Sequence, residues 1–252
     1  MNLLFSKTDL DSANFTANDW RRLSYHAFSE KLSNKDTPFP CVPATHGFST
    51  NQLRYGFVSD PRKKEAITEL AELLKEYGEN SRSYGPYTSL IILFETPEDI
   101  IENNTVEEFE ELYWNILTNV SELDQSEWPE NIPFDPGHHL WEYCFEGEQY
   151  FMYCATPKHV NRQSRSFPTL MFAITPRWVL DTFNAKPKRA DKTKEIIRKR
   201  LGNYDSVDIH PDLKGYGEDD NFEWRQYFIR DDDKSLSKCP FLNKLKKNDK
   251  KA

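Results

Sequence analysis

The order of the apolar segments constrains the fold of this chain more than any other feature of its sequence. Residues 88–95 (TSLIILFE) form a short apolar run with branched side chains, which is typical of a buried strand. Residues 105–123 place an apolar residue every three or four positions, which predicts an amphipathic helix. Residues 141–156 then predict two strands joined by a turn at Glu146 and Gly147.

The later segments continue this alternation. Residues 168–175 predict a further strand, residues 192–204 a basic helix, and residues 223–229 a final strand rich in aromatic and branched side chains. The resulting order of strand, helix, strands, helix and strand is that of a ferredoxin-like fold. We therefore expect the α+β class, with a ferredoxin-like antiparallel sheet and its helices on one face.

The N-terminal part of the chain predicts helices outside this sheet. Residues 15–33 are expected to form a helix that is capped by Asp19. Residues 60–78 predict a second helix, with Asp60 as its cap and Pro61 at its first position, where a proline is tolerated. The sheet is therefore expected to carry an N-terminal helical extension.

A proline-rich segment separates these two helices, and a lysine-rich segment ends the chain. The segment PFPCVPA at residues 38–44 contains three prolines, so an extended, irregular turn is expected there. Residues 241–252 are rich in lysine and are expected to form a flexible, solvated tail. Residues 1–240 are accordingly expected to form a single α+β domain.

Composition and missing motifs exclude several classes of protein. A formal net charge of −8 argues against a nucleic-acid binder, because phosphate contacts need a basic face. No apolar run approaches the roughly 20 residues needed to cross a bilayer, and the N-terminus lacks the basic start of a signal peptide. Zinc-protease, nucleotide-binding glycine and G-x-S-x-G motifs are absent as well. We expect a cytoplasmic protein that binds neither nucleic acid nor membrane.

A long polar connection between two of the predicted strands carries the motif HVNRQSR, which includes His159, Arg162 and Arg165. Arg177 follows just past the next strand. Guanidinium groups bind carboxylates and phosphates through paired hydrogen bonds. The motif therefore predicts an anion-binding site, and the alternative is a solvated loop with surface arginines.

His46 and Cys41 lie five residues apart in and after the proline-rich turn. An imidazole in a rigid loop can ligate a metal or a haem iron, and His159 is the other histidine that lies in a dense polar motif. Cys41 belongs to the sequence FPC at 39–41, which is mirrored by CPF at 239–241. We expect both motifs to pack together and to tie the ends of the chain around a pocket. Haem ligation by a thiolate and redox chemistry are the alternatives.

Motifs along nearly the whole chain resemble those of one family. The presence of both end motifs in a chain of this length makes the match specific. The chain resembles the YqcI/YcgG family of bacterial proteins. The matching segments are FPCVPA (39–44), YGFV (55–58), YTSLIILFE (87–95), TPKHVNRQSR (156–165), PRWVLD (176–181), RLGNYD (200–205), HPDLKGYG (210–217), EWRQYF (223–228) and CPF (239–241).

This resemblance implies an activity. Some members of the family look like haem-dependent N-hydroxylases, which are monooxygenases that oxidise a guanidine nitrogen of arginine or of a related small molecule. It thus implies a haem (heme) iron that activates oxygen or peroxide beside a bound guanidino substrate, while the redox partner stays open. The alternative is a protein that binds haem or an anionic small molecule without turnover.

The resemblance also implies roles for residues of the cofactor site. His46 is the first choice as the axial ligand of the iron, with His159 as the alternative and Cys41 as the third. Arg162 and Arg165 can pair with haem propionates or with a substrate carboxylate.

Substrate contacts are expected from three further residues. Glu142 and Glu223 offer carboxylates that can receive a guanidinium group, and Arg177 offers a guanidinium to an anionic group of the substrate.

Overall fold

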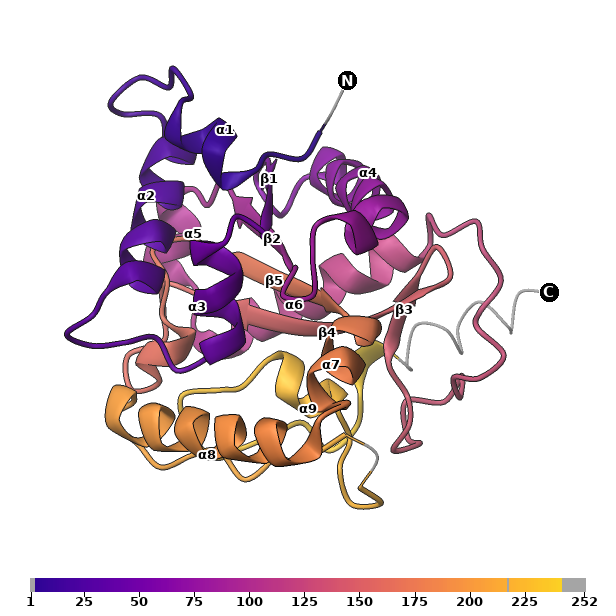
Figure 1. The fold of residues 1–252 in the computed structure, drawn as a ribbon. Coiled ribbons are helices and arrows are strands. Elements are labelled where there is room, and N and C mark those ends of the chain that lie inside the picture. Colours follow the sequence, from indigo (N-terminus) through magenta and orange to yellow (C-terminus); the bar gives the residue numbers. More distant parts are fainter. Residues whose placement is uncertain (1–2, 217, 242–252) are drawn as a thin grey trace.

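A computed structural model describes residues 3–216 and 218–241 of the chain (Figure 1). The expected flexible tail at 241–252 lies, apart from Phe241, outside the described residues. None of the helices in the described ranges combines the length and the apolar character that spanning a bilayer requires.

A mixed sheet of five strands forms the centre of the molecule, in the order β1-β2-β5-β4-β3 (Figure 1). β1 pairs in parallel with β2, and the other neighbours pair antiparallel. The strands are β1 (Arg54–Val58), β2 (Leu90–Phe94), β3 (Tyr143–Phe145), β4 (Glu148–Ala155) and β5 (Met171–Pro176).

Helices precede, connect and follow the strands. They are α1 (Lys7–Asp11), α2 (Trp20–Ser33), α3 (Val42–Ser49), α4 (Lys64–Asn80), α5 (Glu98–Asn103), α6 (Val106–Ser121), α7 (Arg177–Asn184), α8 (Pro187–Tyr204) and α9 (Trp224–Tyr227). Two short 3-10 turns, η1 (Ser81–Ser83) and η2 (Gln163–Arg165), complete the described elements.

The apolar core has two parts, one on each face of the sheet. Successive side chains of a strand point to opposite faces. Ile92 of β2 accordingly packs with α4 and α6, whereas its neighbours Ile91 and Leu93 pack with α2 and α3. The α+β class is confirmed. The ferredoxin-like arrangement is not, because helices cover both faces and the parallel pair of β1 and β2 lies at the edge of a five-stranded sheet.

Two predicted helix boundaries near the N-terminus differ from the structure. α4 begins at Lys64, because the carboxylate of Asp60 instead accepts the backbone N–H of Arg62 in a turn, at 3.0 Å. The proline-rich segment is extended only as far as Cys41, and α3 starts at Val42. Pro43 lies in the first turn of α3, where its missing N–H removes no helical hydrogen bond.

The final predicted strand at 223–229 is wrong, because its centre forms the short helix α9. Trp224 and Tyr227 are three residues apart, and both are buried in the core on the α4–α6 face. A helical turn places residues three apart on one side, whereas a strand would send these two rings to opposite faces.

The two cysteine–proline motifs lie on opposite faces of the sheet. Phe39 and Cys41 pack on the α2–α3 side, whereas Cys239 and Phe241 pack on the α4–α6 side. The Phe241 ring lies 5.7 Å from that of Trp141. The prediction that the motifs tie the two ends together is therefore wrong, because the sheet separates them.

Candidate functional site

A buried cluster joins the three residues that were expected to contact a substrate. Nε of Arg177 donates to Oε2 of Glu142 at 2.6 Å, and Nη2 of Arg177 donates to both carboxylate oxygens of Glu223 at 2.5 Å. All three side chains are almost completely inaccessible to solvent. The structure thus shows one guanidinium group that is held between two carboxylates.

Strand register brings these residues together. Tyr150 of β4 pairs with Pro176 of β5 on one side and with Tyr143 of β3 on the other. Arg177 follows Pro176 directly and Glu142 precedes Tyr143 directly, so they flank β4 near Tyr150 and their long side chains meet. Glu223, which directly precedes α9, supplies the second carboxylate.

Two tyrosines complete the cluster, and sequence reasoning did not identify either as a site residue. The ring of Tyr216 lies 3.9 Å from the guanidinium carbon of Arg177, in a cation–π contact. Tyr216 is also the exposed member of the cluster, with 38% of its surface accessible. The hydroxyl of buried Tyr227 lies 3.3 Å from Glu223. The segments HPDLKGYG and EWRQYF contain both tyrosines, but neither segment indicates that they converge.

When both carboxylates are ionised, the cluster carries one negative charge in excess, because they share one guanidinium. The pKa of Glu223 is raised to about 7, because burial and the charge of Glu142 together outweigh the opposing effect of Arg177. Burial alone would lower the pKa of Arg177, but the attraction of the two carboxylates raises it. The cluster can therefore hold a guanidinium group and can exchange a proton on Glu223 near neutral pH.

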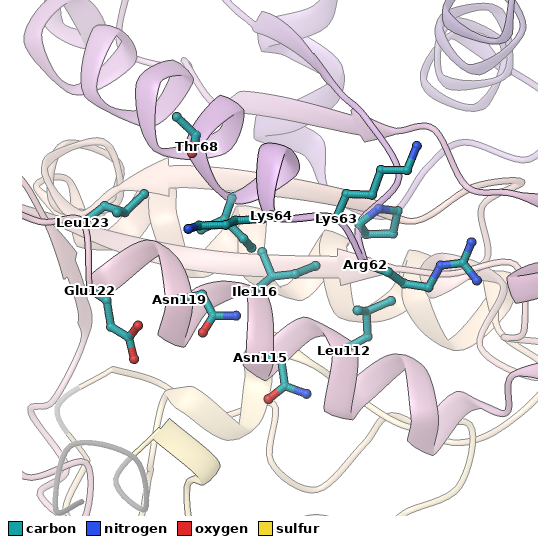
Figure 2. Close-up of a pocket in the computed structure, with 12 residues that line it drawn as sticks. Arg62, Lys63, Lys64, Thr68, Leu112, Asn115, Ile116, Asn119, Glu122 and Leu123 are labelled. Carbon is teal, nitrogen blue, oxygen red and sulfur yellow. The ribbon is translucent and has the colours of Figure 1, made fainter. Parts of the chain in front are cut away.

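Two cavities open elsewhere on the surface, and none of the described histidines and cysteines lines either of them. The first, of about 620 Å³, lies between the start of α4 and the helix α6 (Figure 2). The second, of about 390 Å³, lies between α6 and the segment that contains Arg230, Leu236 and Pro240.

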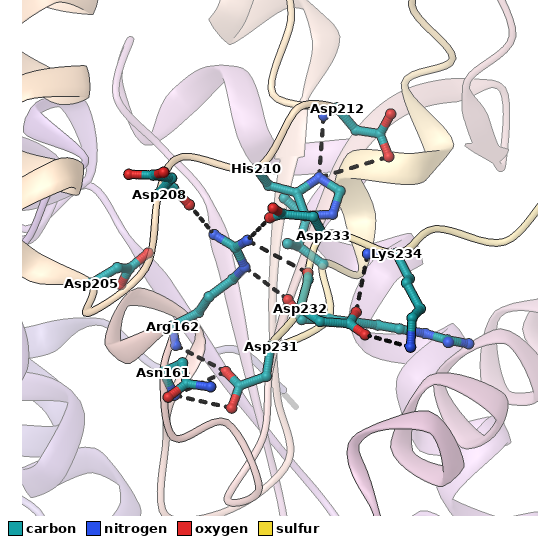
Figure 3. Close-up of polar contacts among 12 residues, drawn as sticks. Asn161, Arg162, Asp205, Asp208, His210, Asp212, Asp231, Asp232, Asp233 and Lys234 are labelled. Atoms are coloured by element: carbon teal, nitrogen blue, oxygen red, sulfur yellow. Dashed lines mark hydrogen bonds and ion pairs between the residues drawn. The ribbon is translucent and has the colours of Figure 1, made fainter.

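Arg162 serves to hold loops together (Figure 3). Its guanidinium donates to the carbonyl oxygens of Arg230 and Asp208, both at 2.8 Å, and to the carboxylate of Asp233 at 2.7 Å. The backbone N–H of Arg162 donates to Asp231 at 2.9 Å. Binding of a propionate or substrate carboxylate by Arg162 would have to replace these bonds.

Arg165 is buried and is used in a similar way. Its guanidinium donates to the carbonyl oxygens of Gln226 at 2.9 Å, Tyr227 at 3.2 Å and Cys154 at 3.3 Å. Its guanidinium carbon also lies 4.1 Å from the centre of the Tyr153 ring. These bonds connect β4 to α9, so the arginine secures the turn that carries Glu223.

His159 is buried, and both of its ring nitrogens have partners. Nε2 lies 2.8 Å from the carbonyl oxygen of Ile229, which can only accept, so Nε2 carries the proton. Nδ1 then accepts the hydroxyl proton of Thr156, at 2.8 Å. Burial lowers the pKa of His159 to about 4, so the imidazole is neutral at physiological pH. Ligation of iron would have to break one of these bonds.

His46, unlike His159, is exposed and has no hydrogen bond to its ring nitrogens from the described residues. It lies on α3, and its ring packs edge-on against that of Tyr87 at 4.6 Å. Cys41 precedes α3 directly. Burial of the Cys41 sulfur raises the pKa of its thiol, which disfavours the thiolate.

The predicted site residues thus fall into three groups: Arg177 with both glutamates, the loop arginines with His159, and His46 with Cys41. The first and third groups lie at the same end of the sheet. Leu90 of β2 pairs with Ile174 of β5. The next pair in the same register is Ser89 and Thr175, whose hydroxyl oxygens lie 2.7 Å apart. Tyr87, against which His46 packs, therefore lies beyond the same strand ends as Arg177.

Comparison with known proteins shows similarity along nearly the whole chain. A model of the YqcI/YcgG family matches residues 28–242. The protein YcgG of Bacillus subtilis (strain 168) is 46% identical over 98% of this chain and 100% of its own length. The protein YqcI of the same strain is 45% identical over 96% of this chain and 95% of its own length.

A more distant relative has a name that states an activity. DcsA of Streptomyces lavendulae is named as a proposed N(omega)-hydroxy-L-arginine synthase, and it is 28% identical over 89% of this chain and 84% of its own length. No solved structure matches the chain.

Proposed function

Because the chain belongs to the YqcI/YcgG family, we propose that it is a haem-dependent oxygenase that N-hydroxylates a guanidino group of arginine or of a related small molecule. The name of its relative DcsA describes the same chemistry on arginine. The structural observation that carries the proposal is the pair Glu142 and Glu223, which already holds a guanidinium group.

In this proposal the substrate guanidinium binds to the cluster from the side of Tyr216. With Glu223 ionised, the cluster has one carboxylate charge more than Arg177 neutralises, so this form favours a second cation. The exposed ring of Tyr216 covers Arg177, and its displacement would open the carboxylates to a substrate. Arg177 keeps both carboxylates in place, and the protonatable Glu223 can take up or release a proton beside the substrate.

Of the three candidate iron ligands, His46 fits a haem best. A histidine that held the iron would need a lone pair that is not already bonded, and no described residue bonds to the ring nitrogens of His46. His159 would have to give up a bond, and Cys41 would have to lose a proton that burial retains. Bound haem would supply the activation of oxygen or peroxide.

Apolar side chains of the sheet lie on the same side of the molecule as His46. Tyr153 and Ala173 are paired across β4 and β5, belong to the α2–α3 face and are only partly buried. Both belong to the part of the core that α2 and α3 cover, and α3 carries His46. Because His46 and the Arg177 cluster lie at the same end of the sheet, one substrate could reach both.

The proposal is tested by reconstituting the purified protein with haem. We expect a stoichiometric pyridine haemochrome, and N-hydroxyarginine by mass spectrometry when arginine is supplied with peroxide or a reductant. His46→Ala should lose the haem while the unfolding transition is retained. Full haem retention by both His46→Ala and His159→Ala would show that neither histidine is the ligand.

Glu223→Gln tests the substrate part of the proposal. Loss of a hydrogen bond to a charged group costs about 1.5–3 kcal/mol, so kcat/KM for arginine should fall roughly tenfold to a hundredfold. Glu98→Gln, at an exposed position of α5, is the matched control and should leave kcat/KM unchanged. Haem binding without product from any guanidino compound would favour the alternative, a haem-binding protein without turnover.

A further inference from the structure

We propose that the groove between α4 and α6 binds a small organic anion, in which a carboxylate or phosphate group is attached to an apolar body. This site is separate from the Arg177 cluster and does not depend on the N-hydroxylase proposal. The sequence predicted an anion site at the arginines of residues 159–165, but backbone carbonyls and Asp233 already accept from them.

The groove has a volume of about 620 Å³ and an apolar floor. Ile67 of α4 and Leu112 and Ile116 of α6 form this floor. Figure 2 shows that Lys64 lies between the two helices, above Ile116. A ligand with an apolar body can therefore bury that body against the floor and keep its polar group near the lysine.

Hydrogen-bond donors without protein partners surround this floor. Lys63 and Lys64 line the groove, and neither forms an ion pair with any residue in the ranges 3–216 and 218–241. The side-chain amides of Asn115 and Asn119, four residues apart on α6, likewise have no hydrogen-bond partner in those ranges. Asp60 and Asp99 bind the third basic residue, Arg62, so we do not count it as a free cation.

The start of α4 also contributes, with partial positive charge that Glu65 in its first turn opposes. This 17-residue helix has Lys63 at its N-cap position, and no side chain caps its first turn. The first N–H groups of a helix lack intrahelical partners, and its dipole favours an anion at this end. Glu122 is the only acidic residue among those that line the groove. The groove is thus a cationic site in a chain whose net charge is −8, which favours anions over cations there.

We would test the proposal by NMR titration of the 15N-labelled chain with 4-phenylbutyrate and, separately, with phenyl phosphate. Saturable shifts of the Lys64 backbone amide and the Asn119 side-chain amide by either compound would support the proposal, and the tighter one would identify the head group. The neutral 4-phenylbutanol should bind several-fold more weakly. Inorganic phosphate binding as tightly as phenyl phosphate would overturn the proposal, because the apolar floor would then contribute nothing.

Variants separate the groove from general charge effects. Removing two partly screened cations should weaken binding by roughly threefold to thirtyfold, so we expect this loss in the double variant Lys63→Gln and Lys64→Gln. Lys75→Gln is the matched control, since Lys75 lies on the same helix outside the groove and pairs with Glu146. Equal losses in both variants, or shifts that never saturate, would contradict the proposed site.

Discussion

At the scale of single residues, Arg177 shows which groups of the chain hold its own guanidinium group. Two carboxylates accept its N–H groups, and the Tyr216 ring covers its face. Arg177→Ala would leave two carboxylates buried without a cation. Breaking a buried ion pair in this way costs about 3–5 kcal/mol, and the variant should lose that much free energy of unfolding, measured with urea.

Guanidinium added in solution should partly restore this variant. The vacated space lies between groups that bind guanidinium, so millimolar methylguanidinium should raise the thermal midpoint of Arg177→Ala but not that of the wild type. Arg82→Ala, at an exposed position, is the control and should not respond. A midpoint that does not change would mean that the two glutamates do not bind an external guanidinium.

Glu223 gives a prediction on the pH dependence of stability. Its pKa is about 7 in the folded protein against 4.5 for the ordinary side chain, because burial disfavours the carboxylate. The folded chain thus holds a proton that the unfolded chain has already lost between these values. The stabilisation of the folded state by this proton is fully present below the pKa of Glu223 in the unfolded chain. It is lost as the pH rises through the pKa of Glu223 in the folded chain, by at most about 1.4 kcal/mol per pH unit.

The measurement compares the wild type with Glu223→Gln by urea unfolding across this pH window. We expect the wild type to lose stability relative to the variant as the pH rises from about 5 to 7. The contribution of buried His159 to stability changes with pH in the opposite direction. Its pKa in the folded protein is lowered to about 4, so its contribution is lost on acidification. Taking the difference between the two proteins removes this contribution, and parallel curves would show that Glu223 titrates normally.

At the scale of elements, the residues at the start of α6 stabilise its first turn, and they made this helix predictable from the sequence. Oγ1 of Thr105 accepts the backbone N–H of Glu108 at 3.2 Å, and the Glu108 carboxylate accepts that of Thr105 at 2.6 Å. This is a capping box. Thr105→Ala should lower the free energy of unfolding by about 0.5–2 kcal/mol, whereas Thr105→Ser should retain most of it. Equal losses in both variants would mean that the hydroxyl does not stabilise α6.

Elements with local signals were predicted well. The hairpin of β3 and β4 was placed correctly, because Glu146 and Gly147 both have positive φ, at 49° and 75°, and glycine favours such turns. β1 and α7 were not identified; α7 is amphipathic, but it has only eight residues and follows β5 directly. β1 includes Arg54 and Gly56 and is defined by its pairing with β2.

At the scale of the whole molecule, the sheet divides the core into two faces, and this division gives a test of the two cysteine–proline motifs. Phe39 and Phe241 lie in different parts of the core. Substitutions without shared partners add to within about 0.5 kcal/mol, so the losses from Phe39→Leu and Phe241→Leu should be additive in the double variant.

The matched control is a pair on the same face. The rings of Tyr143 and Phe241 lie 5.8 Å apart, and aromatic pairs of this kind are worth about 0.5–1.5 kcal/mol beyond their burial. The cycle of Tyr143→Leu with Phe241→Leu should therefore show coupling in urea unfolding. Coupling of the same size between Phe39 and Phe241 would contradict the separation of the motifs by the sheet.

The sequence by itself determined the α+β class, the buried strand β2, the capped helix α6 and the β3–β4 hairpin, because these depend on periodicity, caps and turns between near neighbours. It also singled out Arg177, Glu142 and Glu223 as individual candidates. Only the tertiary structure decided that these three meet, that Tyr216 covers them, and that FPC and CPF lie apart. Glu142 and Glu223 are separated by long stretches of chain, and only strand register and the burial of α9 bring them to one guanidinium.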